Sequence, residues 1–242
     1  MRRWVGVWRL VRTLAHLAHG MAVMRLHFPS LDAAGRHARI QWWSATVLER
    51  LGIALTVHGT PRVSATLLAA NHVSWLDIAA IHAVVPRARF VSKADIKAWP
   101  LVGWLVAGAG TLFIERESKR DALRVVHQMA DALRAGDMVA VFPEGTTGRG
   151  RELLPFHANL LQAAIATRTA VQPVALRYAD RQHAISPSAL WLGDTTLPQT
   201  LWLLATADQL VVHLRVLAPR ATVHADRRAL AETLRIDISS AL

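Results

Sequence analysis

The sequence predicts an α/β fold in which helices flank a mixed, largely parallel sheet, preceded by an N-terminal amphipathic helical segment. Three observations lead to this fold class. Short apolar stretches alternate with helix-like stretches along most of the 242 residues. That length suits one domain with a sizeable core better than two smaller ones. Apolar residues also recur at helical spacing before the first predicted strand, so we divide the chain into residues 1–51 and 52–242.

The N-terminal segment has two contrasting faces if it is helical. One face is apolar and consists of Trp4, Val7, Val11, Leu14, Ala18 and Met21, at steps of three and four residues. The opposite face is basic, with Arg2, Arg9, Arg12, His16 and His19. We expect an amphipathic helix that lies in a lipid interface and associates with the membrane. The alternatives are a helix docked on the protein's own core and a coiled-coil seam.

No membrane-spanning segment is predicted. A spanning helix needs roughly 20 apolar residues, and the apolar run between Arg12 and Arg25 is too short. No small-residue cleavage site follows this run, which argues against a signal peptide. The uncharged stretch 98–114 contains Pro100 and three glycines. It is expected to form a short helix, a turn and a buried strand.

The remaining elements follow in order along the chain. A second amphipathic helix is expected over residues 31–51, and Gly52 ends it. The predicted strands are 53–58, 66–70, 88–92, 110–114, 138–142, 171–178 and 210–217. The predicted helices are 75–84, 119–135, 156–167 and 223–240. In folds of this class the chemistry collects in loops at the carboxyl ends of the strands.

The chain is strongly basic, with a net charge of +11 that comes almost entirely from arginine. A basic surface suits an anionic partner, which here means membrane lipid, nucleic acid or an acidic carrier protein. The sequence has no cysteine. Disulfides, thiolate catalysis and cysteine-ligated metals are therefore excluded.

His72 and Asp77 lie where a predicted strand runs into a helix. In a continuous helix their side chains would point ~140° apart, so they meet only if His72 precedes the helix and Asp77 lies in its first turn. Ser74 is a good N-cap for such a helix. Asp77 could then hold one imidazole nitrogen and make the other a better base. Alternatively, Asp77 only completes a capping box; His27 and Asp32 have the same spacing, and we assign them no role.

Two further blocks end predicted strands in polar residues. The strand over 110–114 leads to Arg116, whose side chain could grip a phosphate or simply lie at a solvated edge. The strand over 138–142 breaks into a loop, 143–151, that contains Gly145, two threonines and two arginines. This loop could cradle an anion with its backbone N–H groups or be an ordinary polar connection. The apolar stretch 171–176 is read as a core or edge strand with little chemistry.

The blocks in this order resemble the lysophospholipid acyltransferase family, typified by 1-acyl-sn-glycerol-3-phosphate acyltransferases. Residues 71–77 look like the family's N-H-x-S-x-x-D block, and residues 142–146 look like its F-P-E-G-T block. Residues 110–116 and 172–175 look like the second and fourth blocks. The resemblance covers roughly residues 50 to 220. The first and third blocks together, about 70 residues apart, are highly specific.

The resemblance implies roles for particular residues. His72 would be the general base and Asp77 its orienter. The acceptor site and the grip on its phosphate would come from Arg116, Glu144, Gly145 and Thr146, with Lys93 close to the acceptor. Catalysis in the family uses no metal or cofactor, and the acyl donor is acyl-CoA or acyl-acyl carrier protein. Both donors are acidic, as the basic charge of the chain would suit.

The expected reaction is acyl transfer to the sn-2 hydroxyl of 1-acylglycerol-3-phosphate, giving phosphatidate. It would take place on an anionic membrane surface, the cytoplasmic face of a bacterial inner membrane, with the protein peripheral or monotopic. Many family members have an arginine where this chain has Thr147. The F-P-E-G-T-T form also resembles lyso-ornithine lipid O-acyltransferases. A non-catalytic binder of lipid or nucleic acid is the alternative from another class, and the tryptophans on apolar faces argue against nucleic acid.

Overall fold

The computed structural model describes residues 2–99, 102–114 and 119–242. Within these residues one seven-stranded sheet has the order β1-β7-β6-β2-β5-β3-β4. The strands are β1 (Ala54–His58), β2 (Thr66–Ala70), β3 (Ala88–Lys93), β4 (Leu112–Ile114), β5 (Met138–Val141), β6 (Val171–Ala179) and β7 (Val211–Val216). Only β6 and β7 pair antiparallel. The predicted mixed, largely parallel sheet is confirmed, with each strand within two residues of its predicted ends.

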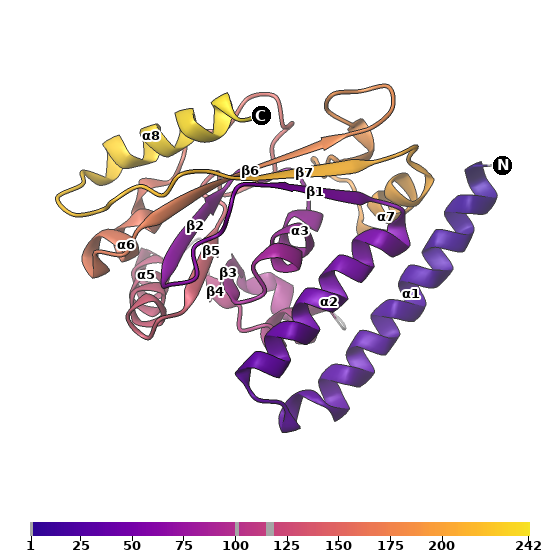
Figure 1. Cartoon of the computed structure of the whole chain (residues 1–242), viewed down its shortest axis with the longest axis horizontal. Coiled ribbons are helices and arrows are strands. Elements are labelled where there is room, and N and C mark those ends of the chain that lie inside the picture. Colours follow the sequence, from indigo (N-terminus) through magenta and orange to yellow (C-terminus); the bar gives the residue numbers. More distant parts are fainter. Residues whose placement is uncertain (1, 100–101, 115–118) are drawn as a thin grey trace.

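Helices cover both faces of the sheet (Figure 1). On one face lie α2 (Ala33–Leu51), α3 (Leu76–Val84) and α7 (Leu197–Thr206), and on the other α5 (Lys119–Arg134), α6 (Gln162–Thr167) and α8 (Arg227–Ser240). Strand β2 is buried on both sides, because Leu68 packs with the first group while Leu67 packs with the second. A continuous apolar run is the expected sequence of such a strand.

The predicted helices differ from the observed ones mainly at their ends. The helix expected over 156–167 is a 3-10 turn, Ala158–Leu161, followed by α6. The stretch 98–114 begins where a 3-10 turn (Ala94–Ala98) ends, and it contains α4 (Val102–Gly108) and β4, close to expectation. Helix α7 was not predicted. The last turn of α2 buries Leu48 and Leu51 in the core beneath the sheet, so this helix shares the hydrophobic core of residues 52–242.

The N-terminal helix α1 (Arg2–Leu26) forms the outermost layer, packed on α2 and α7 (Figure 1). It and α2 form a hairpin. Asp32 caps α2 by accepting a hydrogen bond from the Gly35 backbone, and Gly52, at a φ of +77°, ends it as predicted. No helix in the described part of the chain is long and apolar enough to cross a membrane.

The apolar face of α1 points away from the protein. Trp4 is 80% exposed and Trp8 60%, whereas Gly6, Thr13 and His16 on the other side are buried. The helix is therefore not docked on the core through its apolar face. On the inner side Leu10 packs against the core. The Arg9 guanidinium donates to the carbonyls of Ala205 and Ala207 at the C-terminal end of α7, where unpaired carbonyls favour a cation.

His82, on α3, is a titratable side chain buried in the core. Its ring is 6% exposed, and Nε2 donates to the Ala88 carbonyl at 2.9 Å. Burial lowers the pKa of His82 to about 4 from an ordinary value of 6.5. Between these values the unfolded chain binds a proton that the native protein does not. The free energy of unfolding is therefore expected to fall as the pH drops from 6.5 towards 4, by about 3 kcal/mol in total.

Replacing His82→Gln keeps a donor for the Ala88 carbonyl and removes the titration. We expect this variant to lose less stability than the parent protein between pH 6.5 and 4, as measured by urea unfolding at several pH values. His127→Gln, at an exposed position on α5, is the matched control and should follow the parent curve. Equal slopes in the parent and the His82 variant would show that His82 is not held neutral.

Candidate active site

The predicted functional residues gather at one edge of the sheet. Strands β2, β5, β3 and β4 are parallel neighbours, so their carboxyl ends lie side by side. His72 follows β2, Glu144 follows β5, and Lys93 is the exposed last residue of β3. Arg116, expected just beyond β4, lies outside the described residues. The ends of strands far apart in sequence thus converge as the fold class requires.

His72 and Asp77 meet across the turn between β2 and α3. The distance from His72 Nδ1 to Asp77 Oδ2 is 2.8 Å, with the imidazole side chain 20% exposed and the carboxylate fully buried. A carboxylate acceptor requires Nδ1 to carry the proton, which leaves Nε2 as a proton acceptor. Among the described residues, Asp77 is the side-chain hydrogen-bond partner of the His72 imidazole. The pair can therefore work as a base with a fixed tautomer.

Ser74 is not the N-cap that the sequence predicted. Trp75 occupies the N-cap position of α3 without a side-chain cap, so Asp77 is the second helical residue and not the third. Asp77 Oδ2 accepts from the backbone N–H groups of Val73 at 2.7 Å and Ser74 at 2.9 Å, in the turn that precedes α3. The hydroxyl of Ser74 accepts a long contact of 3.4 Å from the Leu76 N–H. Asp77 thus both holds this turn and orients the imidazole.

Asn71 anchors the start of this turn. The backbone pairing of β2 with β6 ends at Ala70 and Val174. Beyond it, the Asn71 amide donates to the Leu176 carbonyl at 2.9 Å and accepts from the Leu176 N–H at 2.7 Å. The side chain thereby extends the ladder by one step while its own backbone turns away. His72 consequently leaves the sheet from a fixed point.

Phe142 fixes the plane of the His72 imidazole. This residue follows β5, and its ring stacks on that of His72 with centroids 4.0 Å apart and planes 10° apart. Phe90 in turn stacks on Phe142 at 5.7 Å. Ring contact on one side and Asp77 at Nδ1 together leave the imidazole little freedom to turn. The sequence did not indicate this contact.

Glu144 is a buried side chain that links two backbone segments of the site, and we call it the internal brace. Its side chain is 4% exposed, with Oε1 accepting from the His72 N–H at 2.7 Å and Oε2 from the Leu154 N–H at 2.9 Å. Burial raises the pKa of Glu144, while these two hydrogen bonds and the nearby imidazole lower it. Both oxygens are engaged with backbone. Glu144 therefore shapes the site by holding the segment of His72 and the following loop together.

The loop after β5 closes over the backbone of His72. Gly145 adopts a φ of +74°, where a Cβ would come within 2.9 Å of the His157 ring. Its N–H bonds the Phe142 carbonyl, and the Gly148 N–H bonds the His72 carbonyl at 2.7 Å. These two groups are thus used inside the protein. Of the other residues expected here, Thr146 is exposed and available to a ligand.

The position where many family members carry an arginine has a different contact here. The Thr147 hydroxyl hydrogen-bonds the carbonyl of Trp191. Arg149 and Arg151 follow on the exposed side of the same loop. The loop thus has cationic side chains, but they extend from positions other than the family's arginine.

Tyr178 is a site residue that sequence reasoning missed. It lies on β6, is fully buried, and its hydroxyl donates to Asp77 Oδ1 at 2.8 Å. Residues 174, 176 and 178 alternate towards the same face of the sheet, so the pattern could have placed this side chain on the face that packs against α3. The partner of its hydroxyl could not be read from the sequence.

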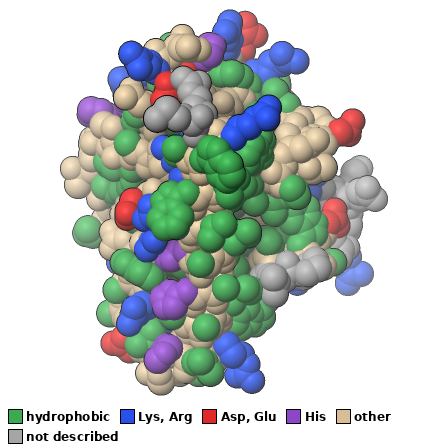
Figure 2. Space-filling view, turned by 90° about the vertical axis from the view of Figure 1, so that its right-hand side faces the viewer, with side chains coloured by type: hydrophobic (Ala, Val, Ile, Leu, Met, Phe, Trp, Pro, Cys, Tyr) green, Lys and Arg blue, Asp and Glu red, His purple; other side chains and the backbone are tan. Residues whose placement is uncertain are grey.

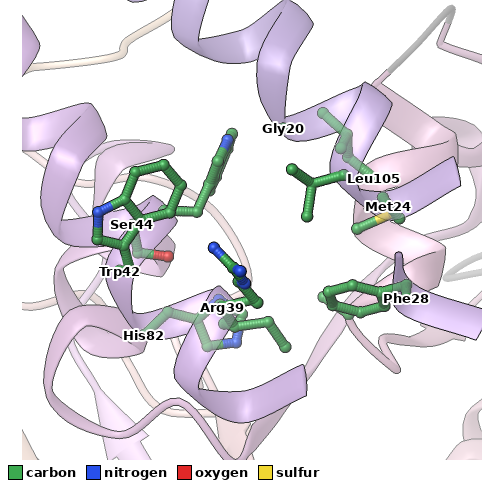
Figure 3. Close-up of a pocket in the computed structure, with 12 residues that line it drawn as sticks. Gly20, Met24, Phe28, Arg39, Trp42, Ser44, His82 and Leu105 are labelled. Carbon is green, nitrogen blue, oxygen red and sulfur yellow. The ribbon is translucent and has the colours of Figure 1, made fainter. Parts of the chain in front are cut away.

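A small hollow lies apart from this site, between α1, α2, α3 and α4 (Figure 3). Met24, Phe28 and Leu105 line one side of it and Trp42 the other. Its volume is about 70 Å³, whereas small-molecule sites usually measure ~300 Å³ or more. Neither His72 nor Asp77 is among its lining residues. The hollow therefore has no part in the chemistry that follows.

Known proteins match the chain over most of its length. The profile of the acyltransferase family matches residues 54–177. The lyso-ornithine lipid O-acyltransferase of Pseudomonas aeruginosa is 35% identical over 240 residues, which cover 97% of this chain and 92% of that protein. The 1-acyl-sn-glycerol-3-phosphate acyltransferase of Neisseria meningitidis is 39% identical over 198 residues, covering 79% of this chain and 76% of that protein.

One solved structure shares the fold. The crystal structure of the 1-acyl-sn-glycerophosphate acyltransferase PlsC from Thermotoga maritima superposes with a TM-score of 0.76 and covers 100% of this chain and 96% of that one. The sequence identity is 18%. This likeness supports the α/β architecture and the arrangement of its sheet.

Glu144→Gln tests the brace. A glutamine offers one acceptor and one donor to two N–H groups, so one contact becomes a donor facing a donor. We expect a loss of about 1–3 kcal/mol in the free energy of unfolding, with faster hydrogen exchange of the amides of residues 72 and 154. Glu152→Gln, at an exposed position in the same loop, should change neither quantity. Unaltered protection at residue 72 would rule out the brace.

Proposed function

The chain belongs to the acyltransferase family, and from that premise we propose that it transfers a fatty acyl chain from a thioester donor to the sn-2 hydroxyl of 1-acylglycerol-3-phosphate, giving phosphatidate. The observation that carries this proposal is the imidazole of His72, fixed at Nδ1 by Asp77 and partly exposed at the sheet edge. The donor is acyl-CoA or acyl-acyl carrier protein.

The geometry supports general-base catalysis by His72. A hydroxyl is a weak nucleophile because its pKa lies far above 7, so it gains from a base within hydrogen-bond reach. Nε2 takes the hydroxyl proton as the oxygen forms a bond to the thioester carbonyl carbon. The carbon–sulfur bond then breaks, and the imidazolium returns the proton to the leaving thiolate. Asp77 stabilises the imidazolium throughout, and no acyl-enzyme intermediate is needed.

Cationic side chains around the site suit an acceptor with a phosphate. Lys93 and Arg149 are exposed on the ends of β3 and of the loop after β5, and we assign Arg116 to the same task. Gly145 and Thr146 belong to the acceptor site, with Glu144 supporting it from inside. An arginine or lysine beside a phosphate forms charge-assisted hydrogen bonds, which are stronger than neutral ones.

A lyso-ornithine lipid is the second candidate acceptor. Two observations favour it. The Pseudomonas aeruginosa relative named for that acceptor matches 97% of this chain, and Thr147 occupies the position where many family members have an arginine, with its hydroxyl bonded to Trp191. Losing that cation matters less for a zwitterionic head group than for a phosphate monoester.

We further propose that the outward face of α1 docks on the membrane, at the cytoplasmic side of a bacterial inner membrane. Trp4, Trp8, Val11 and Leu14 are each at least 55% exposed on this face. Figure 2 shows hydrophobic side chains on this side of the molecule, interspersed with Lys, Arg and His. An exposed apolar surface bordered by cations suits the interface of an anionic bilayer. Trp202 on α7, 38% exposed, extends the same surface.

An acceptor panel tests the reaction. Purified protein is given labelled acyl-CoA or acyl-acyl carrier protein with vesicles that contain lysophosphatidate or lyso-ornithine lipid. We expect phosphatidate to form, and we expect His72→Ala to lower turnover at least about a hundredfold because the base is lost. Acylation of the ornithine lipid alone would replace the proposed acceptor by the second candidate.

His27→Ala is the matched control for this panel. His27 and Asp32 repeat the spacing of the catalytic pair, but Asp32 caps α2 through the Gly35 N–H and His27 is exposed. This variant should keep the parent turnover. Full activity of His72→Ala would instead show that the base has been misassigned.

Membrane docking is tested by the double variant Trp4→Ser/Trp8→Ser. Both side chains are mostly exposed, so folding should be unaffected while apolar contact with lipid is lost. Flotation with anionic vesicles is expected to show binding about tenfold weaker or more. Val63→Ser, which removes an 85% exposed apolar side chain from the loop between β1 and β2, should float like the parent. Equal flotation of all three proteins would assign the membrane contact elsewhere.

A further inference from the structure

Backbone contacts on both sides hold Tyr178 in β6. Strand β6 continues past the end of β2 and there pairs with β7, with Tyr178 opposite Val212. The Tyr178 carbonyl accepts a hydrogen bond from the Ser186 N–H at 2.8 Å. Its side chain is 1% exposed and belongs to the core under α3. The phenol is therefore delivered to the start of α3 from a fixed direction.

The contact of Tyr178 completes the surroundings of Asp77. Oδ2 already accepts from His72 Nδ1 and from the N–H groups of Val73 and Ser74. The Tyr178 hydroxyl donates to the other oxygen, Oδ1, at 2.8 Å. A carboxylate held at Oδ2 alone can still tilt about that oxygen. A donor at Oδ1 removes this freedom and fixes the plane in which Oδ2 faces the imidazole.

The phenol can act only as a donor in this position. Burial raises the pKa of Tyr178 well above the ordinary tyrosine value, and the negative charge of Asp77 raises it further. The hydroxyl thus keeps its proton at every pH at which the protein works. A permanent donor also draws negative charge away from the carboxylate, which limits how strongly Asp77 stabilises a protonated imidazole.

We propose that Tyr178 is a positioning residue for the catalytic pair, fixing the Asp77 carboxylate so that Oδ2 faces His72 and moderating the charge that the imidazole feels. This inference rests on the proposed function, since it assigns Tyr178 to the same reaction. Tyr178 lies behind Asp77 and contacts neither substrate. Its loss should therefore affect turnover and its pH dependence while leaving the KM of the acceptor unchanged.

Tyr178→Phe removes the hydroxyl and keeps the ring. We expect kcat to fall about tenfold, as for the loss of one hydrogen bond to a charged group. The carboxylate keeps more negative charge and so favours the protonated imidazole. The acid limb of the kcat profile is therefore expected to move to higher pH, by about half a unit.

The hydrogen bond from Tyr178 to Asp77 can also be strengthened. Tyr178 is the one tyrosine of the chain, so a tyrosine analogue would change this position alone. Producing the protein with 3-fluorotyrosine in place of tyrosine alters this side chain alone. The fluorinated phenol is more acidic and donates a stronger hydrogen bond to Asp77. The acid limb should then move to lower pH, opposite to the effect of Tyr178→Phe. If Tyr178→Phe fails to fold, the pH profile of the fluorotyrosine protein still tests the inference.

Thr222→Val is the matched control for a lost buried hydroxyl. Thr222 is 1% exposed and donates to the Thr169 carbonyl, away from the site. It should lower stability without moving the pH profile. Suppose that the wild-type protein is active but the pH profile of kcat does not move in Tyr178→Phe or in the fluorotyrosine protein, or moves in the same direction in both. Either result would overturn this inference and leave the proposed function standing. Wild-type protein that acylates neither acceptor would overturn the proposed function itself.

Discussion

The buried carboxylate of Asp77 is the interaction on which the rest of the site depends. It accepts hydrogen bonds from the imidazole of His72, from the backbone N–H groups of Val73 and Ser74, and from the phenol of Tyr178. One side chain thus joins the end of β2, the first turn of α3 and the far part of β6. A fully buried charge is tolerated only when donors surround it, so the contacts that hold the local fold also set the geometry of the His72–Asp77 pair.

Side chains replace the backbone ladder where the chain leaves the sheet before His72. Beyond the last pairing of β2 with β6, Asn71 bonds both backbone groups of Leu176. On the other side Glu144 accepts the N–H of His72. Buried N–H and C=O groups that lost their strand partners would be costly if left unsatisfied. An amide at position 71 and a carboxylate at position 144 satisfy these groups on either side of His72.

The sequence could reveal what depends on neighbours along the chain. Apolar runs placed all the strands, and the five-residue step from His72 to Asp77 required the strand-to-helix junction that the structure has. The missed contacts join distant positions: Tyr178 meets Asp77 across 101 residues, and Glu144 meets the backbone of His72 across 72. No periodicity or local propensity encodes such pairs. The N-cap of α3 lies at Trp75, one residue beyond the predicted Ser74, because residue preferences do not fix the end of a helix to a single position.

The N-terminal helix reverses the usual distribution of polarity, and its packing connects it to the site. Its inner side buries Thr13 and His16 while Trp4 and Trp8 face outwards. Water would oppose that arrangement, because apolar surface stays hydrated, whereas a lipid interface would favour it. Helix α1 packs on α7, and Thr200 of α7 accepts a hydrogen bond from the indole of Trp75, the N-cap of α3, at 3.3 Å. The surface proposed to meet lipid is therefore connected, through two packed helices, to the turn that contains His72 and Asp77.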